Sequence, residues 1–349
     1  MMNFKTKILP RLPGWGASLL MIFFSTYWTY WGANEMYHEG WWGAWYHPLP
    51  YLIPIAATLL PTLAALRWPL AGGISIVCAG IFTFFFFSGD VSFIGLAIAA
   101  VGAAFIVDGI LKRRSPSLKA DVPSAWWKRN WLYRLAFGLP LLVFIAVSVR
   151  MLPVVLTRVD DGDRSARLIE GNGVSLVWAP QGPGWNWEQP YGGYPSWQAL
   201  ALYGLAPIGM EDKPGYGRQD TGETVYATAE DMAEYGLCAY LSADGTTLLD
   251  EPQYIWRLPT VDELVRSLGR HGENAGCAWQ GEFRTQVECT LTPDKETPLW
   301  ATDVPAIYYL AAGSYSDNQA YFVAYNGSVN ATNKLGGNPR HGYRCVREP

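Results

Sequence analysis

Five apolar runs, each about as long as a bilayer is thick, dominate the first half of this chain of 349 residues. They extend from about Leu12 to Ala33 and then over 47–66, 69–88, 91–111 and 133–156. About twenty residues of α-helix cross the hydrocarbon core of a membrane, whereas helices buried in soluble proteins are shorter and less uniformly apolar. The sequence therefore predicts an all-α membrane domain of about five transmembrane helices over residues 1–156.

The distribution of basic residues predicts the orientation of these helices. The first run could be a signal peptide, but it is long and ends without a small-residue cleavage site. Loops near 34–46 and 88–91 carry no Lys or Arg, whereas basic residues gather on the other side, at Lys5, Lys7, Arg11, Arg67, Lys112, Arg113, Arg114, Lys119, Lys128 and Arg129. By the positive-inside rule the amino end is cytoplasmic, and an odd number of spans exports the carboxyl end. We expect an integral protein of the cell or inner membrane with a periplasmic or extracellular carboxyl-terminal domain.

The cysteines independently favour export of the polar second half. Cys78 lies in an apolar run, and the other four cysteines lie in the polar half, at Cys238, Cys277, Cys289 and Cys345. An even count suits two disulfides in an oxidising compartment, although four cysteines allow three connectivities. Metal binding is the alternative, but no CxxC or HxxxH spacing supports it. The net charge of -4 offers no basic footprint for nucleic acid.

The membrane half contains little that indicates transport or metal chemistry. The middles of the predicted spans contain essentially no ionisable residue, so a proton or ion relay is not expected. In the first outer loop, Glu35, His38, Glu39 and His47 could form a weak set of metal ligands. The alternative is an interfacial belt in which the Trp and Tyr residues of this loop lie at headgroup depth. An anchor in membrane lipid, or a surface that docks onto other membrane subunits, fits better.

The polar half divides into a linker over 157–171 and a domain over 172–349. Asp160-Asp161-Gly162-Asp163 has too few oxygen ligands at fixed spacing for a calcium loop, so a solvated turn is expected. Periodicity and capping signals predict several elements of the domain. They are a first strand over 173–178, a helix capped by Thr228 and running to Leu241, a helix over 261–268 that Thr260 caps, late strands over 306–310, 320–325 and 343–346, and an Asn326-Gly327 hairpin turn.

Two short segments carry a family resemblance. Trp256-Arg257-Leu258-Pro259-Thr260, with Glu263-Leu264, and the terminal Gly342-Tyr343-Arg344-Cys345-Val346-Arg347 resemble motifs of the formylglycine-generating, sulfatase-modifying enzymes and of DUF1566-type domains. The resemblance implies an exported α+β, C-type-lectin-like fold over roughly 172–349. It also implies a Cys238–Cys345 disulfide, which leaves Cys277–Cys289 as a local loop closure.

The enzymatic activity of the sulfatase-modifying enzymes is not expected here. That chemistry depends on a late pair of copper-binding cysteines, and the corresponding region, residues 311–320, contains no cysteine. Thiolate ligands are what such a copper site needs. His271 and His341 are the histidines of the polar half, and we expect both on the surface. The prediction is a protein without catalytic residues or cofactors.

A binding role remains. Planar amides, aromatic faces and one guanidinium suit polyhydroxylated or peptide ligands, and the candidates are Asp317, Asn318, Tyr325, Asn326, Asn330, Asn333 and Arg340. The alternative is that these are turn residues chosen for their backbone. We therefore expect a recognition or assembly protein whose lectin-like domain binds a protein or glycan partner. One alternative is an accessory subunit docked by its helices into a larger membrane complex, and a less favoured one is a metal-dependent enzyme that uses the outer loop.

Overall fold

The structure, a computed structural model, describes residues 12–86, 92–114, 131–185, 195–205, 217–218 and 224–349. The chain forms two compact units. One comprises Met1–Trp41 and Trp45–Leu156, and the other comprises Trp42–Ala44 and Thr157–Pro349. We refer to them as the helical unit and the carboxyl-terminal domain, and each is described by itself.

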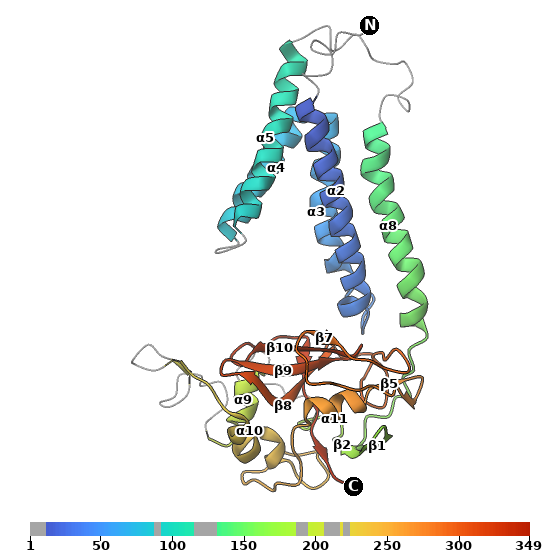
Figure 1. The fold of residues 1–349 in the computed structure, drawn as a ribbon, viewed down its shortest axis with the longest axis vertical. Coiled ribbons are helices and arrows are strands. Elements are labelled where there is room, and N and C mark those ends of the chain that lie inside the picture. The colour runs from blue at the N-terminus through green and yellow to red at the C-terminus, as the bar shows by residue number, and fades with distance from the viewer. Residues whose placement is uncertain (1–11, 87–91, 115–130, 186–194, 206–216, 219–223) are drawn as a thin grey trace. The chain divides into compact units, whose positions relative to one another are not determined.

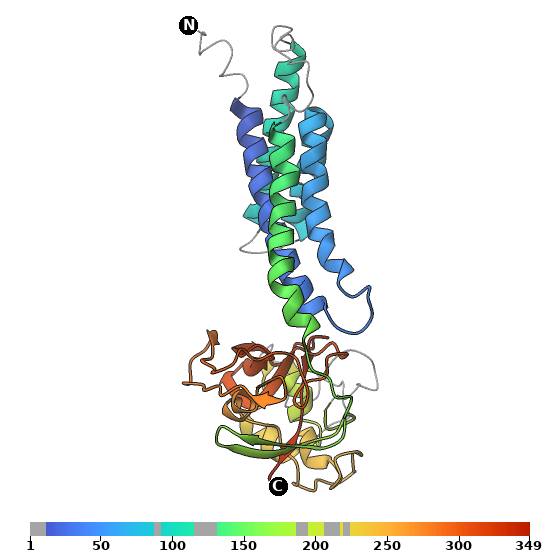
Figure 2. The same cartoon turned by 90° about the vertical axis from the view of Figure 1, so that its right-hand side faces the viewer.

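Long helices build the helical unit (Figures 1 and 2). They are α2 (Leu12–Glu35), α3 (Ile53–Arg67), α4 (Pro69–Phe86), α5 (Phe93–Arg114) and α8 (Trp131–Leu156), with a π-helical turn at Met36–Gly40 and a 3-10 turn at Leu49–Leu52. Within the described part of the chain, four helical segments are long and apolar enough to cross a membrane: Leu49–Arg67, Pro69–Phe86, Phe93–Arg114 and Trp131–Leu156. The chain is therefore a membrane protein.

The first predicted span differs from the other four. It forms the 24-residue helix α2, but this helix is not among the four that meet the apolar criterion. The buried face of α2 includes Ser18, Ser25 and Thr29, and the Ser25 hydroxyl lies 3.1 Å from that of Thr62 in α3. Because α2 packs against α3, α5 and α8, its hydroxyls face other helices, where small and polar residues are tolerated. That α2 crosses the membrane stays a prediction.

Helices α4 and α5 pack closely through glycine. A Cβ atom added at Gly80 would lie 2.5 Å from the amide nitrogen of Ala99, and one at Gly102 would lie 2.7 Å from the carbonyl oxygen of Gly73. Approach of two backbones at this distance needs residues without side chains. The small-residue stretch Gly95–Ala104 of α5 is therefore a helix-packing surface.

Two sheets organise the carboxyl-terminal domain. A three-stranded sheet has the order β1-β2-β12 and a five-stranded sheet has the order β11-β8-β9-β10-β7. The strands are β1 (Arg167–Gly171), β2 (Val174–Trp178), β7 (Thr285–Gln286), β8 (Tyr308–Ser316), β9 (Gln319–Ala324), β10 (Ser328–Asn333), β11 (His341–Gly342) and β12 (Val346–Arg347), with two-residue pairs β3 (Gly217–Arg218) with β4 (Thr224–Val225) and β5 (Gly269–Arg270) with β6 (Glu273–Asn274).

The segment predicted as a linker is folded into this domain. Its β1 strand pairs antiparallel with β2, so that Arg167 lies opposite Trp178 and Gly171 lies opposite Val174. The alternation of Leu168 and Ile169 with polar neighbours was too short to predict a strand. The domain therefore starts with the first residues after α8, and the predicted boundary at residue 172 lies too late.

Capping residues start the short helices of the domain. These helices are α9 (Trp197–Ala201), α10 (Ala229–Tyr235) and α11 (Val261–Arg266), with a 3-10 turn at Leu237–Tyr240. As predicted, Thr228 and Thr260 cap α10 and α11, each in a capping box. The predicted helix from 228 to 241 is shorter than expected, because Gly236 takes an extended conformation. A Cβ atom there would meet the carbonyl oxygen of Met232.

The two faces of the five-stranded sheet lie against two cores. Tyr309, Val323 and Val329 belong to one cluster of buried residues, and Leu310 and Ala320 belong to the other. Successive strand residues point to opposite faces, so the buried residues of β8 and β9 reach a core on each side of the sheet. The domain is thus a mixed α/β unit whose main sheet separates two cores.

Two disulfides brace the domain, and one strand contact joins the two segments that carry the family resemblance. Cys238 is bonded to Cys345, and Cys277 is bonded to Cys289, which are the two pairs that the resemblance implied. In the chain-entropy model the first, with a sequence separation of 107, stabilises by about 4–5 kcal/mol. Arg257 and Val346 exchange both main-chain hydrogen bonds, at 2.9 and 2.8 Å. Spans and disulfides together indicate a membrane protein with an extracytoplasmic domain.

Candidate functional site

The structure does not bring the predicted ligand-binding residues together. Asp317 and Asn318 form the turn between β8 and β9, and Asn333 ends β10 beside that turn. Asn326 lies in the turn at the opposite end of β9 and β10. Five or six residues of extended chain separate the two ends, which is about 20 Å. One small ligand therefore cannot contact the whole predicted set.

Most of the predicted amides bind the backbone next to them. The Oδ1 atoms of Asn326 and Asn333 accept hydrogen bonds from the main-chain amides two residues later, at 3.1 and 2.9 Å. Asn330 Oδ1 accepts one from the amide of Ala331 at 2.9 Å. These contacts are typical of asparagines that stabilise turns and strand edges. The alternative interpretation, turn residues, fits these three positions better than ligand binding does.

Tyr325 and Arg340 have structural contacts. Tyr325 is buried in the first core cluster, and its hydroxyl lies 3.4 Å from a guanidinium nitrogen of Arg158. The carbonyl oxygen of Arg340 accepts hydrogen bonds from the amides of Ile307 and Tyr308. Tyr325 was predicted as a ligand-binding residue, and the structure places its ring in the core.

The outer-loop candidates do not form a metal site. Among the residues that the structure describes, no group of three or more His, Cys, Asp and Glu side chains could hold a metal ion. Glu39 accepts a hydrogen bond from the Tyr51 hydroxyl at 3.1 Å. Helix α2 ends at Glu35 and continues through the π-helical turn that carries His38. The change from α to π geometry alters the spacing that would have put these side chains on one helical face.

A chain of four aromatic rings lies at one end of the five-stranded sheet. The rings of Phe283 and Tyr315 are stacked, with centroids 4.0 Å apart. Tyr321 meets Tyr315 edge to face at 5.6 Å, and Trp279 meets Tyr321 in the same way at 5.6 Å. We call these four residues the aromatic surface. Tyr315 is 43% exposed, whereas the other three are half-buried.

The aromatic surface has rigid supports. Tyr315 and Tyr321 lie on the paired strands β8 and β9, and Trp279 and Tyr321 pack against the first core cluster. Trp279 and Phe283 belong to the loop that the Cys277–Cys289 disulfide closes. The indole nitrogen of Trp279 donates to the carbonyl oxygen of Glu282 at 2.8 Å. Rings held in this way lose little conformational entropy when a ligand binds.

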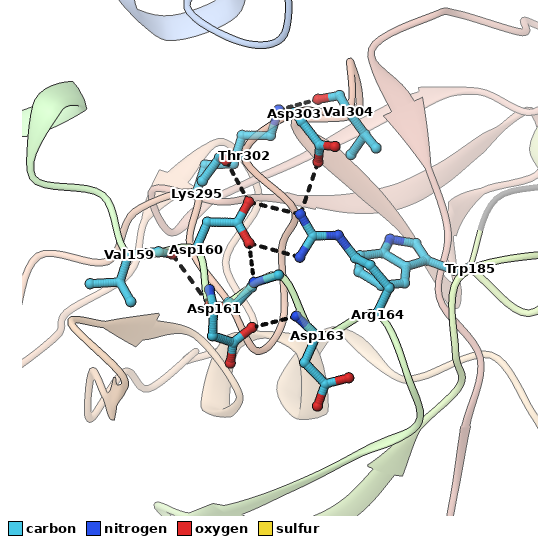
Figure 3. Close-up of polar contacts among 12 residues, drawn as sticks. Val159, Asp160, Asp161, Asp163, Arg164, Trp185, Lys295, Thr302, Asp303 and Val304 are labelled. Atoms are coloured by element: carbon cyan, nitrogen blue, oxygen red, sulfur yellow. Dashed lines mark hydrogen bonds and ion pairs between the residues drawn. The ribbon is translucent and has the colours of Figure 1, made fainter.

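A set of polar contacts holds the first residues of the domain in place (Figure 3). The Asp160 carboxylate accepts two hydrogen bonds from Arg164, at 2.8 and 2.7 Å, and one from the Thr302 hydroxyl at 2.7 Å. Arg164 also donates to Asp303 at 3.0 Å. The hydrogen bonds from Arg164 hold the pKa of Asp160 well below its ordinary value. The segment 160–163 is exposed, in agreement with the predicted solvated turn, and its contacts with Arg164 and Thr302 also attach it to the domain.

Next to this attachment lies a buried ion-pair network. Asp294 binds Arg158 at 2.9 Å and Arg270 at 2.6 Å, and Arg270 also lies 3.1 Å from Glu296. Both carboxylate side chains are almost fully buried. His271 Nδ1 lies 3.7 Å from Glu296 at the exposed margin. Burial of so many charges needs mutual pairing, which indicates a structural joint between the start of the domain and residues 294–303.

Three further cations are buried with carbonyl oxygens and tryptophan rings as partners. Lys295 donates to the carbonyl oxygen of Val304 (Figure 3), and Lys334 donates to that of Ala227 at 2.7 Å and lies 4.8 Å from the Trp197 ring. Arg344 binds three carbonyl oxygens and lies 4.0 Å from the Trp185 ring. Burial lowers the pKa of Arg344 to about 10.

His341 differs from its sequence-based expectation. It is half-buried, and its ring lies 5.2 Å from that of Tyr308 and 4.9 Å from that of Phe322. Both ring nitrogens are buried, and among the described residues neither has a hydrogen-bond partner. Burial lowers the pKa of His341 to about 4. The sequence missed this position because one polar residue in a two-residue strand leaves no pattern.

The thiols of the domain are all engaged. Cys345 of the terminal motif is bonded to Cys238, and the free cysteine of the described residues is Cys78 in α4. Residues 311–316, where the sulfatase-modifying enzymes would carry a catalytic cysteine, belong to β8.

Comparison with known proteins adds little. No protein-family model matches the chain, and no curated protein matches it. Among solved structures, a crystal structure of CarF shows a TM-score of 0.23 and 15% sequence identity, over 55% of this chain and 97% of that chain. A likeness this weak does not establish a common fold and transfers no function.

No sequence pattern indicated that these four aromatic residues form one surface. Its members lie at 279, 283, 315 and 321, on a disulfide loop and two strands. Only the pairing of β8 with β9 and the folding of the loop onto them place the rings together. The sequence signal that remained was the richness of the polar half in Trp and Tyr.

Proposed function

We propose that this chain is a non-catalytic membrane protein whose extracytoplasmic domain recognises a partner through the aromatic surface. The observation that carries the proposal is the stacked pair Phe283 and Tyr315 with Tyr321 and Trp279 edge-on behind it. Clustered rings that are both rigid and partly exposed are typical of recognition surfaces, because large contact areas form at low entropic cost.

The lectin-like identity of the domain belongs to this proposal. Three features support it: short capped helices before a late, mainly antiparallel sheet, the disulfide from the α10 region to the terminal motif, and the main-chain pairing of Arg257 with Val346. Lectin-like domains bind their ligands through loops that a disulfide-bonded framework supports. Trp279 and Phe283 of the aromatic surface lie in such a loop, and the amino-terminal half then anchors the domain in the membrane with the amino end cytoplasmic.

The test uses the full-length protein in a lipid nanodisc. Wild-type protein and the double variant Phe283→Ala/Tyr315→Ala are immobilised and exposed to solubilised envelope material of the producing cell. We expect the wild type to retain a defined component that the double variant loses. Tyr254→Ala is the matched control, because Tyr254 is 62% exposed elsewhere in the same domain. Equal retention by wild type and double variant would refute recognition at this surface.

A second candidate is an accessory subunit of a larger membrane complex. The observation that favours it is the size of the helical unit, since four membrane-length helices exceed what an anchor requires. Mass spectrometry of the protein extracted gently from its native membrane tests this. Stoichiometric membrane partners would support the accessory subunit, and a lone chain or homo-oligomer would rule it out.

A further inference from the structure

We infer that the aromatic surface binds a neutral glycan chain, an inference that rests on the proposed recognition function. The reasons are the geometry of the rings, the balance of charge around them, the state of the neighbouring strand edge, and a polar group beside the rings.

The rings offer faces of the size of a sugar. Phe283 and Tyr315 are nearly parallel, with an angle of 20° between their planes, so one face of each is covered by the other and the Tyr315 side chain remains exposed. Tyr321 and Trp279 stand at 75° and 74° to their neighbours. The apolar C–H face of a pyranose packs on such a ring, and its hydroxyls point sideways to solvent or polar groups.

The charge around the surface favours neither a polyanion nor a polycation. Arg284 is exposed, with its guanidinium 5.1 Å from the Phe283 ring centre. Within the described residues no carboxylate lies within an ion-pair distance of it. Glu282 precedes Phe283 and Asp317 follows Tyr315 by two positions. One basic and two acidic residues close in sequence to the rings give no excess of one sign, so a neutral ligand fits better than a charged polymer.

The strand edge beside the rings does not accept a peptide strand. Ala331 of β10 lies opposite Tyr321, and its amide already donates to Asn330 Oδ1 at 2.9 Å. The carbonyl oxygen of Asn333 accepts the amide of Gly336 at 3.1 Å. Peptides that bind by strand addition need these main-chain groups. Their occupation protects the edge from pairing and disfavours an extended peptide as the ligand.

A polar group lies next to the rings on the β8–β9 turn. The Ser316 hydroxyl donates to Asn318 Oδ1 at 2.9 Å, which fixes the amide of Asn318 and leaves its nitrogen as a donor. Asn318 is exposed. Planar amides exchange hydrogen bonds with sugar hydroxyls through both of their polar atoms. Of the residues predicted from sequence to bind a ligand, Asp317 and Asn318 share the turn that follows the aromatic residues of β8, and Asn318 supplies the neutral amide.

Saturation-transfer NMR tests the inference. The probes are neutral hexasaccharides of glucose and of N-acetylglucosamine, and a decaproline peptide serves as the peptide probe. The full-length protein is held in nanodiscs prepared without glycoside detergents, whose sugar headgroups would compete. We expect transfer to the C–H protons of one hexasaccharide and roughly tenfold or weaker affinity in Phe283→Ala/Tyr315→Ala, as for loss of about 1.4 kcal/mol. Tyr254→Ala should bind as the wild type does.

The outcomes separate the two proposals. Sugar binding that the double variant loses supports both. Decaproline binding that the double variant loses, without any sugar binding, overturns the glycan but keeps recognition at this surface. Sugar binding that the double variant retains overturns the glycan inference. Absence of binding to the hexasaccharides and to decaproline also overturns the glycan inference. The envelope-retention experiment then decides the recognition function.

Discussion

At the scale of single residues, the carboxyl-terminal domain depends on buried polar groups whose partners come from distant parts of the chain. Asp294 joins Arg158 and Arg270, and Arg344 is bound by carbonyl oxygens of residues 179, 298 and 299. Sequence reasoning identified Thr260 as a cap because that contact is local. It could not identify Arg158, whose partner is 136 positions away.

The two acidic partners of the attachment should differ in their contribution to stability. We expect Asp294→Asn to lower the free energy of unfolding by about 3–5 kcal/mol, because it removes the counter-charge of buried arginines. Asp303→Asn, at an ion pair whose carboxylate side chain is 62% exposed, should cost less than about 1 kcal/mol. Denaturant unfolding of the full-length protein, followed by tryptophan fluorescence, measures both. Equal effects would contradict a buried joint at Asp294.

His341 should make the domain less stable in acid. Its pKa in the folded protein, about 4, lies below the ordinary value near 6.5, so the unfolded chain takes up the proton first. The corresponding stability is fully present above pH 6.5 and falls between pH 6.5 and 4, by up to about 3 kcal/mol. His341→Phe should remove this dependence, since a phenyl ring suits the contacts with Tyr308 and Phe322. Melting temperatures of the wild type and the variant are compared at pH 7 and 4.5. An unchanged pH dependence in the variant would show that His341 is not the cause of the acid sensitivity.

At the scale of elements, sequence patterns predicted the helices, strands and turns that depend on contacts between residues close in sequence. The capped starts of α10 and α11, the β2 strand and the Asn326-Gly327 turn were all recognisable, because caps and turns depend on neighbouring residues. Strand β10 was not predicted, since Ser328-Val329-Asn330-Ala331-Thr332-Asn333 is mostly polar. It forms because β9 and β7 supply its main-chain partners.

The α4–α5 hairpin should be sensitive to added side chains at its glycines. Gly80→Val would push a branched side chain into the backbone of Ala99 and Gly95, and we expect loss of folded protein after detergent extraction. Gly138 of α8 has no atom within 4 Å of an added Cβ, so Gly138→Val should be tolerated. Size-exclusion profiles of the two variants give the readout, and a normal profile for Gly80→Val would show that the hairpin adjusts.

At the scale of the whole molecule, the number of spans decides the sidedness of the chain. Four segments meet the length and composition criterion, and α2 is long enough to be a fifth. With five crossings and a cytoplasmic amino end, the disulfide-bonded domain reaches the oxidising side that its cysteines need. With four crossings and the same amino end it would stay in the cytoplasm.

Reporter fusions should show an exported carboxyl end. A periplasmic or extracellular reporter fused after Pro349 or inserted near Trp45 should be active, and one inserted near Lys119 should be inactive. Alkylation of Cys238 and Cys345 should require a reductant, since both are in a disulfide. A cytoplasmic carboxyl end would contradict both the fifth span and the extracytoplasmic placement.

The sequence by itself determined the membrane helices, the division of the chain into an apolar and a polar half, the helix caps and the main hairpin turn. Each of these depends on composition or on residues near one another in the chain. The tertiary structure alone decided that the exposed DDGD segment is attached to Arg164 and Thr302, that the ring nitrogens of His341 are buried and that four distant rings form one surface. These features depend on contacts between residues far apart in sequence, which composition and periodicity do not encode.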